Sequence, residues 1–403
     1  MNVIAISLST SLGELEHQSI YADLLKEFVN NGHSVSVVVP SERRLGKGTY
    51  LETKYGIDVL HVSIGNVTKC GLIEKGFSYL TVGYCFKREI ARNFDPSSFD
   101  LVLFTTPPTT FYGVISWLKK QSAAKSYLLL KDIFPQNSID LGMLRTTGIK
   151  GFIYRYFKHT EKQTYKVADY IGCMSPANER YLLMHEPYLE PNKVEVNPNS
   201  LTPVSKNAFD RAALREKFGL PTDLPIYVYG GSLGKPQAID WFVEALRLNE
   251  LDGKRYFVVA GSGTDRKLLE NFVNDEKPCF MKLLPYLSRE DFDSLLLASD
   301  VGLVLLDYRF TIPNYPCRTL SYMQASIPYI AATDTATDVG KIAEANGFGI
   351  ACTSDDPANL IRACEQIEQA DIKSMGARAY DYFIKHYTAN QSYKMIKERL
   401  NVD

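Results

Sequence analysis

The sequence predicts an α/β protein built from two doubly wound, parallel-sheet domains of the Rossmann type, with a cleft between them. Three observations support this prediction. At 403 residues, the chain is long enough for two domains that each bury a core. Short apolar, β-branched runs alternate with helical patterns in both halves, which is typical of parallel sheets. A proline-rich stretch near the middle separates the two series.

The composition is that of an ordinary globular protein and narrows the functional classes. Hydrophobic residues make up 45% and charged residues 23%. The formal net charge of −1 gives no whole-chain electrostatic case for nucleic-acid binding. Seven cysteines without a C-x-x-C pair favour neither disulfides nor a zinc site and fit a cytoplasmic setting. We expect neither a signal peptide nor a membrane span, because residues 1–40 predict strand, helix and strand and no 18-residue apolar run occurs.

Residues 1–198 are predicted to form the first domain. It opens with a βαβ unit, in which a helix at 17–31 joins two strands and Gly13 lies in the loop before the helix. Further apolar runs extend a parallel sheet. The predicted strands are 2–7, 34–39, 58–62, 100–104, 126–130 and 170–174.

Residues 199–378 are predicted to form the second domain, after an interdomain linker placed at 190–224 that could contain a short helix at 212–218. The predicted strands are 225–229, 255–260, 301–306 and 328–332, and the predicted helices are 237–249, 265–274 and 319–325. Residues 379–403 are predicted to form a C-terminal helix that packs back toward the first domain, because aromatic and aliphatic residues recur there at helical spacing.

The loop at 229–237 is the first candidate site, since ligands in open α/β sheets bind where strands end. It contains Gly231, Ser232 and Lys235 between a strand and a helix. Glycines permit close backbone approach and a lysine can meet a phosphate, so we predict a phosphate-binding loop rather than a plain turn. The loop has neither the P-loop nor the G-x-G-x-x-G spacing, which argues against ATP hydrolysis and hydride transfer.

Two further loops of the second domain are predicted to bind the same ligand. Gly261 and Gly263 follow the next strand, although G-x-G is also common in tight turns. Arg318 is predicted to lie in the first turn of a helix, where a cation is unfavourable unless an anion lies nearby. Arg318 is therefore a candidate diphosphate ligand, and the alternative is a solvated arginine.

Lys131 and Asp132 are the candidate catalytic residues of the first domain. They directly follow a hydrophobic strand, where reacting groups of open sheets are found. Asp132 could act in catalysis, orient an acceptor, or cap a turn before a proline. Gly13, Thr106 and Pro107 lie at comparable strand ends, and we predict either a cleft wall on the acceptor side or a structural role.

We predict neither a bound metal nor a cofactor. The six histidines show no ligand spacing, and Asp355 and Asp356 precede a proline and a helical stretch, as capping residues do. Residues 69–94 and 150–166 mix aromatic side chains with lysines and arginines. Such helices can lie on an anionic bilayer, so 69–94 is predicted as a peripheral membrane contact; the alternative is a helix packed on a sheet.

Taken in order, several segments resemble the retaining GT-B glycosyltransferases of family 4, the glycosyl transferases group 1. The resemblance is to the branch that builds capsule, O-antigen and other surface polysaccharides, and it covers nearly the whole chain. Each segment alone is loose, but their order and spacing together are specific. The segments are Gly13 with 31–35, then 131–135, 175–176, 230–237, 261–263, 284–286 and 316–328.

The resemblance implies a metal-independent enzyme on the cytoplasmic face of the inner membrane. It would move an N-acetylated amino sugar or a hexose from a UDP-linked donor to a polyprenyl-diphosphate-linked saccharide. The implied donor site lies in the second domain, with Lys235 and Arg318 at the diphosphate and the first domain holding the acceptor. The remaining implied donor contacts are Gly261 to Gly263, Leu284 and Tyr286 at the nucleoside, with Thr319 and Ser321.

One feature of the family is missing from this chain. Most members carry two glutamates eight residues apart, and this chain has Pro313 and Ser321 at those positions. The second glutamate normally contacts the donor ribose, so its replacement bears on donor affinity, nucleotide preference or activity. Two alternative functions therefore stay open: a catalytically degenerate GT-B partner or scaffold, and a GT-B nucleotide-sugar epimerase, which would need a cluster of acid and base groups.

Overall fold

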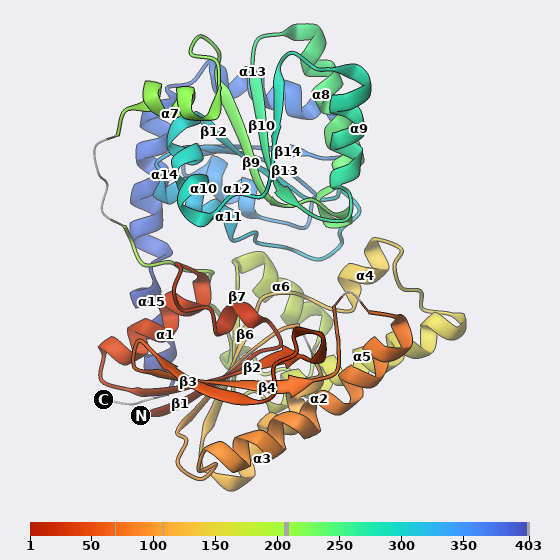
Figure 1. The fold of residues 1–403 in the computed structure, drawn as a ribbon, viewed down its shortest axis with the longest axis vertical. Helices are drawn as coiled ribbons and strands as arrows, with labels where there is room; N and C mark the ends of the chain where they lie inside the picture. The colour runs from red at the N-terminus through yellow and green to blue at the C-terminus, as the bar shows by residue number, and fades with distance from the viewer. Residues whose placement is uncertain (69, 108, 205–208, 401–403) are drawn as a thin grey trace. The chain divides into compact units, whose positions relative to one another are not determined.

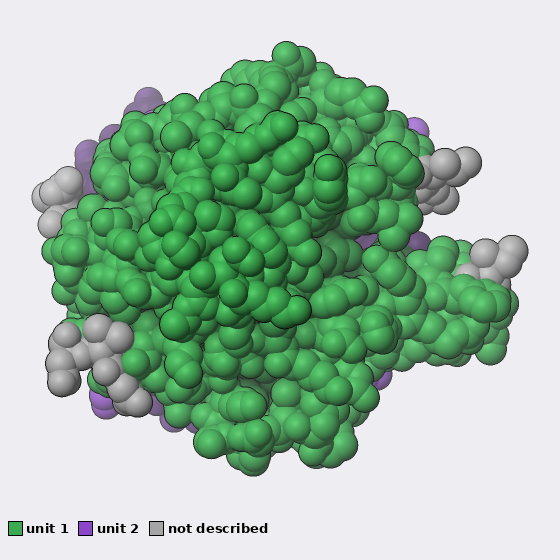
Figure 2. All heavy atoms as spheres, turned by 90° about the horizontal axis from the view of Figure 1, so that it is seen from below, with its two compact units in different colours: residues 1–202, 389–403 green, residues 203–388 purple. Residues whose placement is uncertain are grey.

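The computed structural model describes residues 1–68, 70–107, 109–204 and 209–400, apart from the side chains of residues 72, 73, 75 and 149. The chain divides into two compact α/β units, drawn as a ribbon in Figure 1 and coloured separately in Figure 2. Unit 1 comprises Met1–Thr202 and Ala389–Asp403, and unit 2 comprises Pro203–Thr388.

Unit 1 contains an eight-stranded sheet with the order β3-β4-β2-β1-β5-β6-β7-β8. Every pairing in it is parallel except that of the edge strand β3, which runs antiparallel to β4. The strands are β1 (Asn2–Ile6), β2 (Ser34–Glu42), β3 (Tyr50–Lys54), β4 (Ile57–Ile64), β5 (Leu101–Thr105), β6 (Lys125–Leu130), β7 (Tyr170–Cys173) and β8 (Val194–Val196).

Helices cover both faces of the unit 1 sheet, because successive strand residues point to opposite faces. Ile4 and Ile6 of β1 pack in one core with α2, α3 and α5, whereas Val3 and Ala5 pack in another with α1 and α15. The helices are α1 (Ile20–Asn30), α2 (Leu72–Asn93), α3 (Tyr112–Gln121), α4 (Gln136–Asp140), α5 (Gly148–Val167), α6 (Pro176–His185) and α15 (Ala389–Arg399).

Unit 2 contains a six-stranded, wholly parallel sheet with the order β11-β10-β9-β12-β13-β14. The strands are β9 (Ile226–Ser232), β10 (Tyr256–Ser262), β11 (Met281–Leu284), β12 (Val301–Leu305), β13 (Tyr329–Thr333) and β14 (Gly349–Thr353). The helices are α7 (Arg211–Phe218), α8 (Ile239–Asp252), α9 (Arg266–Glu276), α10 (Arg289–Ala298), α11 (Arg318–Gln324), α12 (Val339–Ala345), α13 (Pro357–Glu368) and α14 (Ile372–His386). The core on one face joins the sheet to α8, α9 and α13.

Two predicted segments differ from the structure. The predicted linker 190–224 contains the edge strand β8, which was not predicted. Helix α7 lies where a short helix at 212–218 was considered, and Asp210 caps its N-terminus by accepting bonds from the backbone N–H groups of Ala212 and Ala213. The predicted single helix 379–403 is instead two helices that meet near Thr388, α14 in unit 2 and α15 in unit 1. Residues 401–403 of that prediction lie outside the described residues. Helical periodicity continues across the junction, so the sequence pattern hides the break.

Strands at or near the sheet edges were missed by the sequence prediction. These are β3, β8, β11 and β14. In β3, for example, all five residues keep some exposure, and Glu52 and Lys54 are charged. Edge strands are stabilised on one side only and tolerate polar residues, so they lack the apolar run by which a buried parallel strand is recognised.

Candidate functional site

The carboxyl ends of the unit 2 strands carry most of the predicted donor residues. The chain runs from β9 to β10 and β11 on one side of the sheet, and then continues with β12 on the other side of β9. The order in which strands are added to the sheet therefore reverses between β9 and β12. Such a switch point is where ligands bind in open α/β sheets, because the loops on its two sides diverge and leave room.

Arg318 lies at this switch point, at the start of α11. Its guanidinium carbon is 4.4 Å from the ring centroid of Tyr229, which belongs to β9. The Tyr229 hydroxyl donates a 2.7 Å hydrogen bond to the carbonyl oxygen of Ser232, so the ring under the guanidinium is fixed. Within the described residues, the Nη1 atom of Arg318 is buried and has no hydrogen-bond partner. A buried guanidinium N–H without an acceptor is costly unless a ligand supplies one.

Gly231 provides the space beside this guanidinium. A Cβ at position 231 would lie 3.3 Å from Nη2 of Arg318 and 3.4 Å from its Cζ. The φ angle of Gly231 is +124°, which side-chain-bearing residues rarely adopt. The end of β9 and the start of α11 therefore form one corner, in which Gly231 faces the guanidinium of Arg318.

Gly261 and Gly263 have a backbone reason to be glycine. A Cβ at Gly261 would lie 2.0 Å from the carbonyl oxygen of Gly231, and one at Gly263 would lie 2.1 Å from that of Leu233. The Leu233 N–H also donates to Ser262 O at 2.9 Å. The two glycine loops are thus packed directly on each other, and Gly261 and Gly263 help to shape the corner around Gly231.

The other predicted donor residues, at or just after the ends of strands β9 and β11, are exposed to different degrees. Ser232 and Lys235 are exposed, and within the described residues Lys235 has no ion pair. Leu284 is half-buried at the end of β11, and its carbonyl oxygen accepts a 3.0 Å bond from Arg266. The Tyr286 side chain is 77% exposed. An exposed aromatic ring beside the sheet edge could stack on a base.

Thr319 and Ser321 are both buried in α11. The Thr319 hydroxyl donates a 2.9 Å bond to Pro316 O, so it holds the entry turn of the helix. Pro313 is also buried. Neither position 313 nor position 321 can supply a carboxylate.

The switch point of the unit 1 sheet lies between β1 and β5. There, the hydroxyls of Ser7 and Thr105 are 2.8 Å apart and hydrogen-bonded. Thr106 ties the end of β5 to the end of β6, since its hydroxyl donates to Asp132 O and accepts from Lys131 N, both at 3.2 Å. These hydroxyl hydrogen bonds link the ends of β1, β5 and β6, and those of Thr106 hold the backbone that carries Asp132.

Asp132 has an unusual carboxyl group. Burial raises its pKa to about 6, although bonds from the Ile133 N–H and the Asn137 amide favour the ionised form. The Asn137 Nδ2 donates to Oδ2 of Asp132 at 2.8 Å. The residue as a whole is partly exposed. A carboxyl group that ionises near pH 6 can accept a hydrogen bond or a proton from a hydroxyl at neutral pH.

The other predicted residues of this edge are placed differently. Gly13 is buried: a Cβ there would lie 3.1 Å from the side chains of both Val39 and Val59, and its N–H donates to Thr10 O. Gly13 therefore packs on the sheet and has no free N–H for a ligand. Pro107 is exposed and Lys131 is partly exposed at the strand ends.

Three residues of these edges were missed by the sequence prediction. Tyr229 underlies Arg318, Asn137 orients Asp132, and Arg266 donates to Gly261 O at 2.6 Å as well as to Leu284 O, which ties β10 to β11. Asn137 lies in helix α4, directly after the K-D-I-F-P segment, and could have been found by its spacing from Asp132. The roles of Tyr229 and Arg266 depend on contacts between distant segments.

The predicted membrane segment corresponds to α2. Lys69, with which it begins, lies outside the described residues. Phe77, Leu80 and Tyr84 are 67%, 67% and 68% exposed and lie on one helical face by their spacing. On α5, the exposed large side chains are Phe152, Ile153 and Tyr156. Among the described helices, none is long and apolar enough to cross a membrane.

Metal sites are a separate question. Among the described residues, no group of His, Cys, Asp or Glu is arranged to hold a metal ion.

Comparison with known proteins agrees with this description. Residues 210–382 match the family model of the glycosyl transferases group 1. The probable glycosyltransferase WbjE of Pseudomonas aeruginosa is 24% identical over 290 residues, which are 69% of this chain and 68% of that protein. The family match and the name of this relative support a glycosyltransferase.

Solved GT-B structures resemble the whole chain. Sucrose-phosphate synthase from Thermosynechococcus elongatus superposes with a TM-score of 0.74 at 13% identity, covering 99% of this chain and 98% of that one. HepE of Anabaena, solved with UDP and glucose, gives a TM-score of 0.68 at 14% identity and covers 99% of both chains. At such identities the likeness shows the fold, and the predicted class of two parallel-sheet, Rossmann-like units is confirmed.

Proposed function

We propose that the chain is a retaining glycosyltransferase of family 4 that acts in bacterial capsule, O-antigen or related surface polysaccharide biosynthesis. It moves an N-acetylated amino sugar or a hexose from a UDP-linked donor, bound by unit 2, to a polyprenyl-diphosphate-linked saccharide, bound by unit 1. The reaction takes place at the cytoplasmic face of the inner membrane.

The observation that carries the proposal is the buried, unpartnered Nη1 of Arg318 beside Gly231. A diphosphate supplies the acceptor oxygens that this N–H lacks, and charge-assisted bonds to phosphate are strong because the guanidinium is always ionised. The exposed Lys235 adds a second cation on the same edge. A scaffold without a donor has no use for an arginine held in this way, which favours a working site over a degenerate partner.

The cations have a catalytic role as well as a binding role. As the sugar leaves, negative charge grows on the diphosphate, and Arg318 and Lys235 stabilise that charge in place of a metal ion. The leaving phosphate can then accept the proton of the attacking hydroxyl on the same face of the sugar, which retains the anomeric configuration. Pro313 and Ser321 remove two carboxylates from the donor side, so this step needs no protein carboxylate there.

The acceptor side is supported by Asp132 and by the surface of α2. A carboxylate with a pKa of about 6 is ionised at neutral pH and can hold the attacking hydroxyl. The exposed Phe77, Leu80 and Tyr84, followed on α2 by Arg88 and Arg92, suit the interface of an anionic bilayer where a polyprenyl carrier resides.

The test is thermal stabilisation of the full chain by UDP, GDP, TDP and ADP without metal, with uridine as the control lacking phosphates. Ligand at 100 times its Kd stabilises the folded state by about 2.7 kcal/mol, so UDP should raise Tm clearly and uridine should not. A shift with GDP, TDP or ADP in place of UDP would overturn the donor assignment. No shift with any nucleotide would favour the degenerate scaffold.

A further inference from the structure

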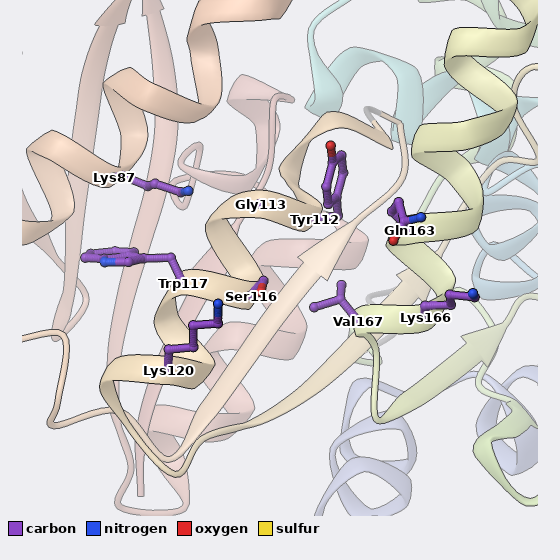
Figure 3. Close-up of a pocket in the computed structure, with 9 residues that line it drawn as sticks. All are labelled: Lys87, Tyr112, Gly113, Ser116, Trp117, Lys120, Gln163, Lys166 and Val167. Carbon is purple, nitrogen blue, oxygen red and sulfur yellow. The ribbon is translucent and has the colours of Figure 1, made fainter.

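A hollow of about 580 Å³ lies among three helices of unit 1, α2, α3 and α5. Its lining includes Lys87 from α2, Ser116, Trp117 and Lys120 from α3, and Lys166 from α5 (Figure 3). These residues belong to helices and not to the loops that follow β1, β5 and β6. Its lining therefore does not include Asp132 or any other residue predicted for the site.

The hollow has an unbalanced charge. Three of its nine lining residues are lysines, and none is acidic. Within the described part of the chain, Lys87 and Lys120 have no ion pair, whereas their neighbour Lys119 is paired with Asp169 at 2.7 Å. Like charges that share a hollow repel each other, and a bound anion would relieve that repulsion.

Two of the lysines flank Trp117. In the view of Figure 3, Lys87 and Lys120 extend on either side of the Trp117 ring, while Lys166 points away from both. The ammonium of Lys166 lies 5.5 Å from the ring centroid of Tyr188. Gly113 lies beside Lys87, since a Cβ there would be 3.7 Å from Nζ of Lys87, an ordinary contact distance.

We propose that this hollow is a second anion site, which binds a phosphate-bearing group through Lys87 and Lys120. Lysine ammonium groups are point charges that suit a phosphate, the Ser116 hydroxyl can donate a further bond, and Trp117 offers an apolar wall for the organic part of the ligand. The volume lies in the range of small-molecule sites and exceeds what one phosphate needs. The same chemistry occurs in soluble phosphate esters and in the headgroups of anionic lipids.

Trp117 provides a local readout of binding. The chain has two tryptophans, and the other one, Trp241, belongs to the core of unit 2. In a Trp241→Phe background, the fluorescence of Trp117 is titrated with glycerol 3-phosphate and with phosphatidylcholine vesicles that contain phosphatidic acid. We expect saturable quenching by at least one of the two probes, and at least tenfold weaker binding in the Lys87→Gln/Lys120→Gln variant.

The control is the Lys47→Gln/Lys125→Gln variant, which removes the same charge from exposed positions of unit 1 outside the hollow. It should bind as the parent does, and both variants should keep the parent's UDP-dependent thermal shift. Quenching by glycerol 3-phosphate identifies a soluble phosphate ester, and quenching by the vesicles alone identifies a lipid headgroup. Equal binding by both lysine variants, or no quenching by either probe, would overturn the proposal.

Discussion

The two sheets end in carboxyl edges of opposite chemistry. The unit 2 edge combines crowded glycines with a guanidinium whose Nη1 atom is buried and unpartnered among the described residues, and it carries no carboxylate at positions 313 and 321. The unit 1 edge combines hydrogen-bonded hydroxyls with the Asp132 carboxyl, whose pKa is about 6. The same kind of sheet thus presents either fixed cations or a titratable carboxyl group at its carboxyl edge, according to its loops.

The strongest test of this contrast is Asp132→Asn. If the carboxylate holds the attacking hydroxyl, we expect kcat to fall by about 100-fold or more, with UDP affinity unchanged. Because burial raises the pKa of Asp132 to about 6, the wild-type rate should rise with pH through 6 and then level off. The Asp132→Asn variant should not show this rise in rate around pH 6. Rates and profiles are measured with donor and a saccharide acceptor.

A folding control separates chemistry from damage in this variant. A raised pKa means that the native state binds a proton more tightly than the unfolded state does. The free energy of unfolding therefore falls as pH rises from about 4 to about 6. At pH 7.5 the full destabilisation that comes from ionising the buried Asp132 carboxyl group is present. Asp132→Asn should accordingly be no less stable than the wild type at pH 7.5. Asp140, which is bound by Gln136 as Asp132 is by Asn137, serves as the matched position, and an equal rate loss in Asp140→Asn would contradict a special role for Asp132.

The next effect in size is expected from Arg318→Ala. Loss of charge-assisted bonds to the diphosphate should weaken UDP binding by about 2–3 kcal/mol, which is roughly 30- to 150-fold in Kd. Titration calorimetry with UDP measures this directly. Arg362→Ala, on the exposed face of α13, should bind UDP normally. Wild-type affinity in Arg318→Ala would remove the guanidinium from the donor site.

The smallest effect concerns the surface of α2 in unit 1. Leu80→Ser/Tyr84→Ser should weaken co-sedimentation with anionic vesicles by about tenfold, because two apolar side chains no longer enter the interface. The matched control is Leu251→Ser/Leu268→Ser, which removes exposed apolar side chains from unit 2. If the two double variants lose binding equally, α2 is not the membrane contact.

Much of the fold and part of the site could be predicted from the sequence. Central strands such as β1, β2, β9 and β10 were found because a buried parallel strand is largely apolar over several consecutive residues. The position of Arg318 in the first turn of α11 also follows from local sequence. These features depend on residues that are neighbours in the chain, and hydrophobic periodicity and capping report on them directly.

Other features were decided by tertiary structure alone. Edge strands such as β3, the break between α14 and α15, and the burial of Gly13 were not evident, because each depends on which distant segment packs alongside. The same holds for the site: Gly231 meets Arg318 only after β9 and α11 come together, and Asp132 acquires its raised pKa only when the fold excludes water. Residue type and spacing determined which groups stand at the strand ends; packing determined their desolvation and partners, and these set their chemistry.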